Sequence, residues 1–510
     1  MNGRQIKSPE RINQCRSFNS ETSGGSNAER PSTQAPQTVL DVDVGISWWT
    51  RSARVAVLVL SDVLALFASA AFAYLLWALP VRSMGPELYL PLWPAAGLFI
   101  AGWAQAGLYP GLGLGPVESL RRLSIATVFS FALLATLTFA LKLPHQYSRM
   151  TFFIAFLLAL ALVPILRYLT LNVVGRLDWW REPVVLIGNG EFIRRTVSNL
   201  RGSPKLGYRP VGILREDHAS AARSIQEIPV LGDLSQAGKI RREGVRVALV
   251  NGSTFADPSF LDQLQRHFSR LLLIQEYDDL PVEGVQIRNL GRVVGVEYSN
   301  NLLQWQNRVI KRLLDIGIGS VASILFLPLA GACSLAVWIK DRRPVFFLQR
   351  RAGLCGRRFL LPKIRTMELN AHEDLESHLA ADPVMREEWE RGFKLKSDPR
   401  VIQGVGPFLR RWSLDELPQL WSVARGDMSL VGPRPFPDYH LARFSTGGRE
   451  FRELVRPGIT GLWQVTLRGD SDVAAQESSD HYYIRNWSVW LDLYILGKTI
   501  SAVMSGRGAY

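Results

Sequence analysis

Cysteine is scarce in this 510-residue chain, and its three cysteines are far apart. Cys15, Cys333 and Cys355 include no Cys-x-x-Cys pair, and the seven histidines show no metal-binding spacing. Neither a disulfide framework nor a zinc site is therefore indicated, and a cytoplasmic location fits the soluble parts of the chain. The length predicts three or four units with ample hydrophobic core.

The sequence also lacks a complete dinucleotide-binding fingerprint. Gly188 and Gly190 follow an expected buried strand at Val184–Ile187, but Ile193 stands where Gly-x-Gly-x-x-Gly requires its third glycine. The pattern favours a tight strand-to-helix turn over nucleotide binding. A membrane-anchored, NAD-dependent sugar dehydratase or epimerase needs the intact fingerprint, and is therefore the weaker of two enzyme hypotheses.

Acidic residues are fewer than basic ones, 45 against 59, which gives a formal net charge of +14. The basic residues are scattered, and no nucleic-acid-binding motif accompanies them, so no nucleic acid is expected as a partner. Such an excess is typical of cytoplasmic loops beside membrane spans. Anionic lipid headgroups and sugar nucleotides are the expected partners.

Long apolar segments, by contrast, are plentiful. Residues 1–47 are polar and rich in Ser, Asn, Gln, Pro and Gly, which predicts a disordered tail. Residues 48–176 then hold four apolar segments, each near the ~20 residues that cross a bilayer as a helix. These segments predict a four-helix transmembrane bundle, and they are Ala53–Leu79, Leu88–Leu108, Leu120–Leu141 and Thr151–Val174.

The loop charges predict how this bundle is oriented. Arginines gather before the first segment, between the second and third, and after the fourth, whereas the other two loops carry few basic residues. The positive-inside rule then places both ends of the bundle in the cytoplasm. We therefore predict a multi-pass membrane protein whose soluble parts lie on the cytoplasmic side.

Residues 182–300 change to short apolar strands that alternate with helical stretches. Val184–Ile187, Val211–Leu214 and Val245–Val250 are expected strands, and Glu191–Leu200 is an expected helix. This alternation predicts a parallel α/β middle domain that is similar to nucleotide-binding folds.

Residues 305–510 form the last predicted unit, which opens with an apolar stretch. Ile316–Ile339 is long enough to cross a membrane, but it contains Pro328 and has basic residues at both ends. Proline removes a backbone donor and bends a helix. We therefore predict a proline-broken re-entrant helix over about 311–340, which enters one leaflet and returns. A straight fifth span is the alternative.

Charged residues of this unit gather in short blocks separated by glycine and proline. Arginine in a rigid turn suits bidentate binding of phosphate. A carboxylate among arginines is expected to have a lowered pKa and to stay ionised. Such a carboxylate can attack phosphorus, and a second one can hold Mg²⁺ together with substrate phosphates. The candidate residues are Lys363, Arg365, Arg410, Asp415, Glu416, Arg434 and Arg456.

Each candidate also has an ordinary structural interpretation. Asp415 and Glu416 fit the start of a helix, as acids that face its dipole. The arginines fit surface cations bonded to loop carbonyls, and Lys363 with Arg365 fits a solvated strand face. Taken alone, Asp415 and Glu416 favour the helix interpretation. Phosphoryl chemistry is favoured by the blocks together.

The blocks occur in an order that resembles the bacterial sugar transferase family, the polyprenyl-phosphate sugar-1-phosphate transferases with a monotopic catalytic core. The whole layout, four membrane helices followed by a nucleotide-fold-like domain and an α/β core, is similar to the large members of that family. The blocks are Lys363-x-Arg365-Thr366-Met367, Asp398-Pro399-Arg400, Ser413-Leu414-Asp415-Glu416-Leu417-Pro418-Gln419-Leu420, Gly426-Asp427-Met428-Ser429-Leu430-Val431-Gly432-Pro433-Arg434-Pro435, Arg456-Pro457-Gly458-Ile459-Thr460-Gly461 and the ending Gly506–Tyr510.

The resemblance implies transfer of glucose-1-phosphate or galactose-1-phosphate from a UDP-hexose to undecaprenyl phosphate, with release of UMP. Asp415 would be the nucleophile that forms an aspartyl-phosphosugar intermediate. Glu416 would hold Mg²⁺, and the Lys and Arg candidates would bind phosphates or the nucleotide. A bacterial inner-membrane location, a homodimer and a role in O-antigen, capsule or exopolysaccharide synthesis are also implied. A non-catalytic scaffold for polysaccharide export is the remaining alternative.

Overall fold

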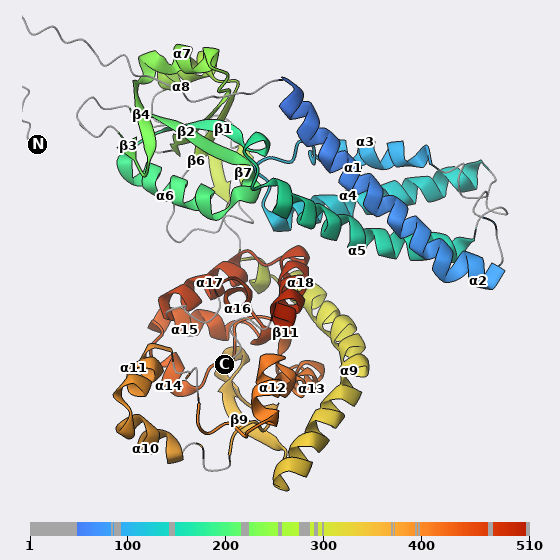
Figure 1. Ribbon diagram of the computed structural model, residues 1–510, viewed down its shortest axis with the longest axis vertical. Coiled ribbons are helices and arrows are strands. Elements are labelled where there is room, and N and C mark those ends of the chain that lie inside the picture. Colours follow the sequence, from blue (N-terminus) through green and yellow to red (C-terminus); the bar gives the residue numbers. More distant parts are fainter. Residues whose placement is uncertain are drawn as a thin grey trace, which may run out of the picture. The chain divides into compact units, whose positions relative to one another are not determined.

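Three groups of elements follow one another along the chain in the computed structural model (Figure 1). The predicted tail at 1–47 and the ending Gly506–Tyr510 lie outside the residues that the structure describes. Those residues are 48–82, 85, 93–141, 148–215, 224–252, 258–274, 286–289, 294–297, 300–368, 371, 373–392, 395, 398–467 and 473–505.

The first group is a helical bundle, as predicted. Its elements are α1 (Trp48–Ala73), a π-helical turn (Tyr74–Ala78), α2 (Leu79–Arg82), α3 (Ala95–Gln105), α4 (Pro116–Ala140) and α5 (Arg149–Val174). The continuous helix from α1 to α2 and helices α4 and α5 are each long and apolar enough to cross a membrane. The described part of α3 is shorter than predicted, because it begins only after Pro94, and its 11 residues span ~17 Å.

Polar contacts join the bundle's helices inside an apolar core. The Arg167 guanidinium lies 2.6 Å from Asp62 Oδ2, and the Tyr109 hydroxyl donates to the same oxygen at 2.7 Å. Phe99 and Phe131 belong to this apolar core and pack edge to face, with ring centroids 4.9 Å apart. A charged pair buried among apolar side chains is tolerated because each charge has a partner.

The second group is an α/β unit with a six-stranded sheet in the order β3-β4-β2-β1-β5-β6. Neighbouring strands are parallel, as predicted, except β3 and β4, which are antiparallel and make the sheet a mixed one. Helix α6 lies on one side of the sheet, and α7 and α8 lie on the other (Figure 1). The bounds are β1 Glu182–Ile187, α6 Gly190–Gly202, β2 Tyr208–Arg215, β3 Ser224–Ile225, β4 Ile228–Asp233, α7 Ala237–Arg242, β5 Val247–Asn251, α8 Pro258–His267 and β6 Arg270–Ile274.

The glycine turn after β1 has a structural explanation. A Cβ atom on Gly188 would lie 2.8 Å from atoms of both Asn251 and Phe192, so packing against β5 requires glycine there. Asn189 Oδ1 accepts from the Phe192 backbone N–H and caps α6. Ile193 is fully buried in the core of the sheet. These contacts agree with the interpretation of a tight strand-to-helix turn.

An NAD-dependent dehydratase or epimerase also needs a Tyr-x-x-x-Lys pair, and this spacing occurs in the chain at Tyr494 and Lys498. Both residues lie on α18 (Val489–Ser505), far along the chain from the glycine turn and outside the six-stranded sheet. The spacing therefore gives no support to a dehydratase or epimerase.

The third group contains short helices, a hairpin and a parallel strand pair. Strands β9 and β10 form the antiparallel hairpin, and β11 pairs in parallel with β12. Before this group, β7 (Gln286–Asn289) pairs with β8 (Val294–Glu297). The bounds are α9 Trp305–Asp341, β9 Phe346–Ala352, β10 Arg358–Ile364, α10 Glu373–Ala381, α11 Pro383–Gly392, α12 Val405–Arg411, α13 Gln419–Arg425, β11 Ser429–Val431, α14 Asp438–Leu441, α15 Thr446–Glu453, β12 Gly458–Thr460, α16 Leu462–Thr466, α17 Val473–Arg485 and α18 Val489–Ser505.

Helix α9 differs from the proline-broken helix predicted over about 311–340. It continues through Pro328 as one 37-residue helix, and it curves along one edge of the third group (Figure 1). A bend rather than a break is enough to accommodate the missing backbone donor of proline. The apolar length of α9 would also suffice for a membrane span.

The first half of α9 is fastened to this group by buried charges. Lys311 Nζ lies 2.8 Å from Asp492 Oδ2 on α18 and 3.6 Å from Asp315 Oδ1. Asp315 Oδ1 also accepts from the Ser429 hydroxyl and the Leu430 backbone N–H of β11. One lysine thus balances two buried carboxylates and joins α9 to β11 and α18.

Removing this lysine is expected to destabilise the third group strongly. In Lys311→Met, Asp315 and Asp492 would face each other without a cation, which costs about 3–5 kcal/mol for a broken buried pair. Unfolding of the detergent-solubilised protein by heat or denaturant measures the change. Lys340→Met, at the exposed end of the same helix, is the matched control, and equal stability of the two variants would contradict the assignment.

Candidate functional site

Asp415 and Glu416 lie in a single 3-10 turn, Leu414–Glu416, between α12 and α13. Ser413 precedes the turn with a φ of +52°, a backbone conformation that is uncommon outside glycine and that reverses the chain sharply after α12. The acids therefore come before α13 rather than within its first turn. Strained backbone of this kind is frequent at functional sites.

Glu416 forms ion pairs with two basic side chains, which belong to different parts of the fold. Lys363 Nζ on β10 and Arg434 Nη2 in the loop after β11 each lie 2.8 Å from Glu416 Oε1. The Glu416 side chain is 16% exposed, so these contacts occur in a half-buried place where ion pairs are weakly screened. The structure thus brings together three of the predicted site residues and places Asp415 beside them.

The two carboxyl groups differ in their electrostatic surroundings. Burial acts to raise the pKa of Glu416, but the charges of Arg434 and Lys363 outweigh it and hold that pKa well below its usual range. Burial also raises the pKa of Asp415; the charge of Lys363 opposes this rise, and the Glu416 carboxylate adds to it. A lowered pKa was expected for a carboxylate among arginines, which is right for Glu416 and wrong for Asp415.

Arg410 approaches the site from the end of α12. Its Nε donates to the Thr366 hydroxyl at 3.0 Å. Burial lowers the pKa of Arg410, while the charges of Asp398 and Asp415 act in the opposite direction. Arg410 therefore stands within electrostatic reach of Asp415, and its role in binding substrate phosphate stays a prediction.

Two other predicted residues bind backbone carbonyls instead of facing Glu416. Arg365 is buried, donates to the Pro344 carbonyl at 2.7 Å, and forms an ion pair with Asp341 at the end of α9. Arg456 Nε donates to the Gly426 carbonyl at 2.8 Å. Their contacts are those of structural residues, and their roles in substrate binding stay predictions.

The glycine- and proline-containing blocks pack directly on one another. A Cβ atom on Gly432 would lie 2.7 Å from the Arg456 carbonyl oxygen, and one on Gly458 would lie 2.1 Å from the Gly432 nitrogen. Only glycine permits this approach of the loops that follow β11 and precede β12. The close packing fixes the loop from which Arg434 reaches Glu416.

Arg351, in β9, also lies near the site, although no sequence pattern indicated it. Its Nη2 donates to Gln349 Oε1 at 2.6 Å. Burial lowers the pKa of Arg351 to about 10, and the nearby charge of Arg434 adds to this effect, while the charges of Tyr439 and Glu416 oppose it. No motif signals this arginine, because only the pairing of β9 with β10 brings it to the site.

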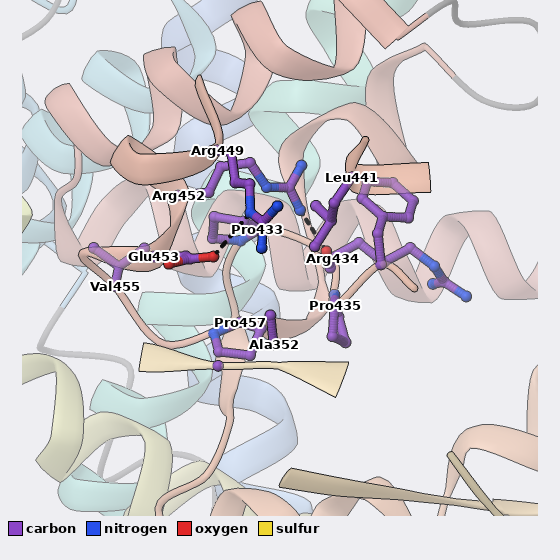
Figure 2. A pocket seen from close by; sticks show the side chains of 12 residues that line it. Ala352, Pro433, Arg434, Pro435, Leu441, Arg449, Arg452, Glu453, Val455 and Pro457 are labelled. Carbon is purple, nitrogen blue, oxygen red and sulfur yellow. Dashed lines mark hydrogen bonds and ion pairs between the residues drawn. The ribbon is translucent and has the colours of Figure 1, made fainter. Parts of the chain in front are cut away.

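A pocket lies next to the Arg434 loop (Figure 2). Arg452 donates to the Arg434 carbonyl at 2.5 Å and forms a buried ion pair with Asp480, also at 2.5 Å. The pocket thus has a rigid wall that supports the Arg434 backbone. Its lining residues are Ala352, Gly353, Pro433, Arg434, Pro435, Phe436, Leu441, Arg449, Arg452, Glu453, Val455 and Pro457.

His440, to which the sequence assigned no role, is buried beside this pocket. Its ring stacks on Phe436 with centroids 3.9 Å apart, and its Nε2 lies 3.1 Å from Gln476 Oε1. Burial lowers the pKa of His440 to about 4, although the Gln476 contact opposes the change. The imidazole is therefore neutral near pH 7 and serves the packing of the core.

Acid is expected to destabilise the protein through His440. The folded pKa of about 4 lies below the ordinary value of 6.5, so the unfolded chain binds the proton more readily and stability falls as pH drops from 6.5 towards 4. His440→Gln should reduce this slope. The free energy of unfolding of the original protein and of His440→Gln, measured at pH 7 and pH 5, tests this prediction. An identical change between the two pH values in both proteins would show that His440 does not contribute to the loss of stability in acid.

The described residues contain no group of three or more His, Cys, Asp or Glu side chains that could hold a metal ion. Mg²⁺ does not require such a cage, because it commonly uses one or two carboxylates together with substrate phosphates and water. The bonds from Lys363 and Arg434 both end on Glu416 Oε1. Neither bond uses Glu416 Oε2, so this oxygen and the Asp415 carboxylate are the groups that would hold Mg²⁺, and the magnesium site stays a prediction.

Comparison with protein families gives two matches along the chain. Residues 306–506 match the family described as bacterial sugar transferase, and residues 106–249 match a family described as CoA-binding domain. The first match covers the third group of elements and contains every candidate site residue.

Comparison with individual proteins gives relatives over most of the chain. An undecaprenyl-phosphate galactose phosphotransferase of Salmonella typhimurium is 34% identical over 402 residues, 77% of this chain and 82% of that protein. An Escherichia coli UDP-glucose:undecaprenyl-phosphate glucose-1-phosphate transferase is 29% identical over 65% of this chain and 69% of that protein. The exopolysaccharide production protein ExoY of Rhizobium meliloti is 43% identical over 39% of this chain and 88% of its own length.

Proposed function

This chain belongs to the bacterial sugar transferase family, in its large form, and from this premise we propose that it transfers hexose-1-phosphate from a UDP-hexose to undecaprenyl phosphate. The single observation that carries the proposal is the Asp415-Glu416 turn, in which Glu416 is held by Lys363 and Arg434 at 2.8 Å each. Two carboxylates and several cations in one place suit chemistry on a diphosphate.

In the first proposed step, an Asp415 carboxylate oxygen attacks the sugar-linked phosphorus of the donor. The bond from this phosphorus to the bridging oxygen breaks, and UMP leaves with that oxygen. An aspartyl-phosphosugar remains on the enzyme. Asp415 is suited to this role because Glu416 takes the direct contacts of Lys363 and Arg434, which leaves Asp415 without an ion-pair partner among the described residues.

In the second proposed step, an oxygen of the lipid phosphate attacks the same phosphorus. The bond between phosphorus and Asp415 breaks, which regenerates the carboxylate and gives undecaprenyl diphosphate hexose. Arg410 and Arg434 stand near enough to Asp415 for their charges to affect its pKa. Together with Lys363, whose charge has the larger effect on Asp415, they are the groups that would bind the phosphate oxygens during both steps.

Mg²⁺ is part of the proposal, with Glu416 as its principal protein ligand. When bound, the ion would neutralise charge on the donor diphosphate and so favour departure of UMP. The low pKa of Glu416 keeps this carboxylate ionised, as metal binding requires.

We also propose that α9 enters the cytoplasmic leaflet and returns. Both of its ends pack on the same soluble core: Lys311 binds Asp492 near the start, and Val337 packs against Ile364 near the end. Between them, Ile324 and Leu327 are 77% and 71% exposed. A helix that crossed the ~30 Å hydrocarbon layer would carry its ends to opposite sides, so an exposed apolar middle with two docked ends favours re-entry.

In this proposal the Asp415-Glu416 turn lies on the cytoplasmic side of the bacterial inner membrane, where UDP-sugars and the lipid phosphate meet. The product would begin O-antigen, capsule or exopolysaccharide synthesis. A homodimer belongs to the same proposal and is supported by the family resemblance alone.

A UMP-release assay tests the proposal. The full chain in detergent would be given Mg²⁺, undecaprenyl phosphate and each of a panel of UDP-sugars. Rapid release of UMP with one UDP-hexose, together with a lipid-linked sugar product, is expected. Absence of UMP release with every UDP-sugar would overturn the proposal and favour a scaffold.

A further inference from the structure

We propose that Arg351 and Arg434 form a phosphate-binding subsite beside the Asp415-Glu416 turn. This inference rests on the proposed function, because it assigns a residue that none of the sequence motifs includes to the binding of one of the two phosphate-bearing substrates. The ligand class is a phosphate group, which comes either from the UDP-hexose or from the lipid phosphate.

The register of the β9–β10 hairpin places Arg351 on the face that carries Lys363. Lys363 pairs with Phe347, and Arg351 lies four residues beyond Phe347 on β9, so all three share one face of the hairpin. Arg350, the preceding residue, lies on the opposite face and is exposed. The hairpin thus directs one of two adjacent arginines towards the site and the other away from it.

The Arg351 side chain has donors that its protein contacts do not satisfy. Nη2 donates to Gln349 Oε1 at 2.6 Å. Nε is buried and has no hydrogen-bond partner in the described part of the chain. A buried guanidinium N–H without an acceptor is unfavourable, and a bound phosphate oxygen would supply the acceptor.

The charges around Arg351 favour an anion as well. Arg434 is close enough for its charge to lower the pKa of Arg351, it lines the same pocket as Ala352 and Gly353 directly after Arg351, and Lys363 adds a third cation. Glu416, bonded to Lys363 and Arg434, is the carboxylate shared by this cluster. Asp438, which also lies near Arg351, forms an ion pair with Arg358. Arg351, Arg434 and Lys363 outnumber the Asp415 and Glu416 carboxylates by one positive charge, which a negatively charged phosphate oxygen would balance.

The test compares Arg351→Gln with Arg350→Gln in the full chain in detergent. Both variants remove one arginine from β9, but only Arg351 faces the site. Steady-state rates would be measured with the best UDP-hexose of the panel and with undecaprenyl phosphate, varying one substrate at a time. Thermal unfolding of each variant would be recorded in parallel, and Arg351→Lys would keep the charge but lose the planar fork.

Arg351→Gln is expected to raise the KM of one substrate by about tenfold or more, Arg351→Lys by less, and Arg350→Gln by under about twofold. A raised KM for the UDP-hexose assigns the subsite to the donor. A raised KM for undecaprenyl phosphate, with unchanged UMP release in the absence of lipid, assigns it to the acceptor. Both outcomes support the subsite.

An Arg351→Gln protein whose two KM values stay within about twofold of the original would overturn the subsite. So would equal effects of Arg351→Gln and Arg350→Gln, because they would reflect general charge loss. Neither result touches the proposed function, which fails separately if no UDP-sugar yields UMP or if Asp415→Asn keeps its activity.

Discussion

Asp415→Asn is expected to abolish UMP release, with a loss of about 10³-fold or more in kcat. The amide has nearly the shape of the carboxylate but cannot attack phosphorus, so the covalent step is lost. UMP would be measured with saturating UDP-hexose and Mg²⁺. Because burial raises the pKa of Asp415, removal of its charge should not destabilise the fold, and thermal unfolding should stay close to that of the original protein.

Asp262→Asn provides the matched control for this substitution. Asp262 is exposed on α8 in the sheet domain, away in sequence from every candidate residue. Its replacement makes the same chemical change and should leave UMP release unaltered. Full activity of Asp415→Asn beside this control would remove Asp415 as the nucleophile.

Glu416→Gln is expected to lower kcat/KM by about 10²- to 10³-fold and to raise the Mg²⁺ concentration needed for half-maximal activity. The substitution removes the charge that Lys363 and Arg434 share, so both cations lose their common partner. It also weakens the proposed metal ligand. Magnesium titrations of UMP release measure both effects in one experiment.

Glu450→Gln, at an exposed position of α15, controls for the loss of one glutamate charge. It should show the original magnesium requirement. If Glu416→Gln behaved in the same way, Glu416 would serve neither as metal ligand nor as the anchor of the two cations.

The order of the domains, and Asp415 and Glu416 as candidate site residues, could be predicted from the sequence because both depend on local patterns. Apolar length identifies α1, α4 and α5, and the alternation of strands and helices identifies the parallel sheet. The block around Asp415 was recognised by residue types in a fixed order. Its pairing with Lys363 needed only that two recognised blocks fold together.

The partners of the arginines could not be predicted, because they depend on where elements end. Lys363 and Arg365 have the spacing of one strand face, but β10 ends at Ile364, and Arg365 turns to Pro344 and Asp341 instead. Arg351 belongs to no recognised block, and its position depends on the register between β9 and β10.

The raised pKa of Asp415 was missed for a related reason. Neighbours in sequence suggested that nearby arginines would lower it, but Lys363 and Arg434 make their contacts with Glu416. Adjacent acids can thus have opposite pKa shifts, which depend on the direction of each side chain. The continuous course of α9 through Pro328 is a similar case, since packing at both ends decides whether a proline bends or interrupts a helix.

Trapping of the covalent intermediate tests the central claim most directly. The full chain would be mixed with Mg²⁺ and UDP-hexose labelled in the sugar, without lipid phosphate, then denatured and digested for peptide mass spectrometry. The account predicts about one UMP released per active site and a hexose-phosphate adduct on the peptide that contains Asp415. Lipid-linked product formed by an enzyme that never carries label on Asp415 would contradict it.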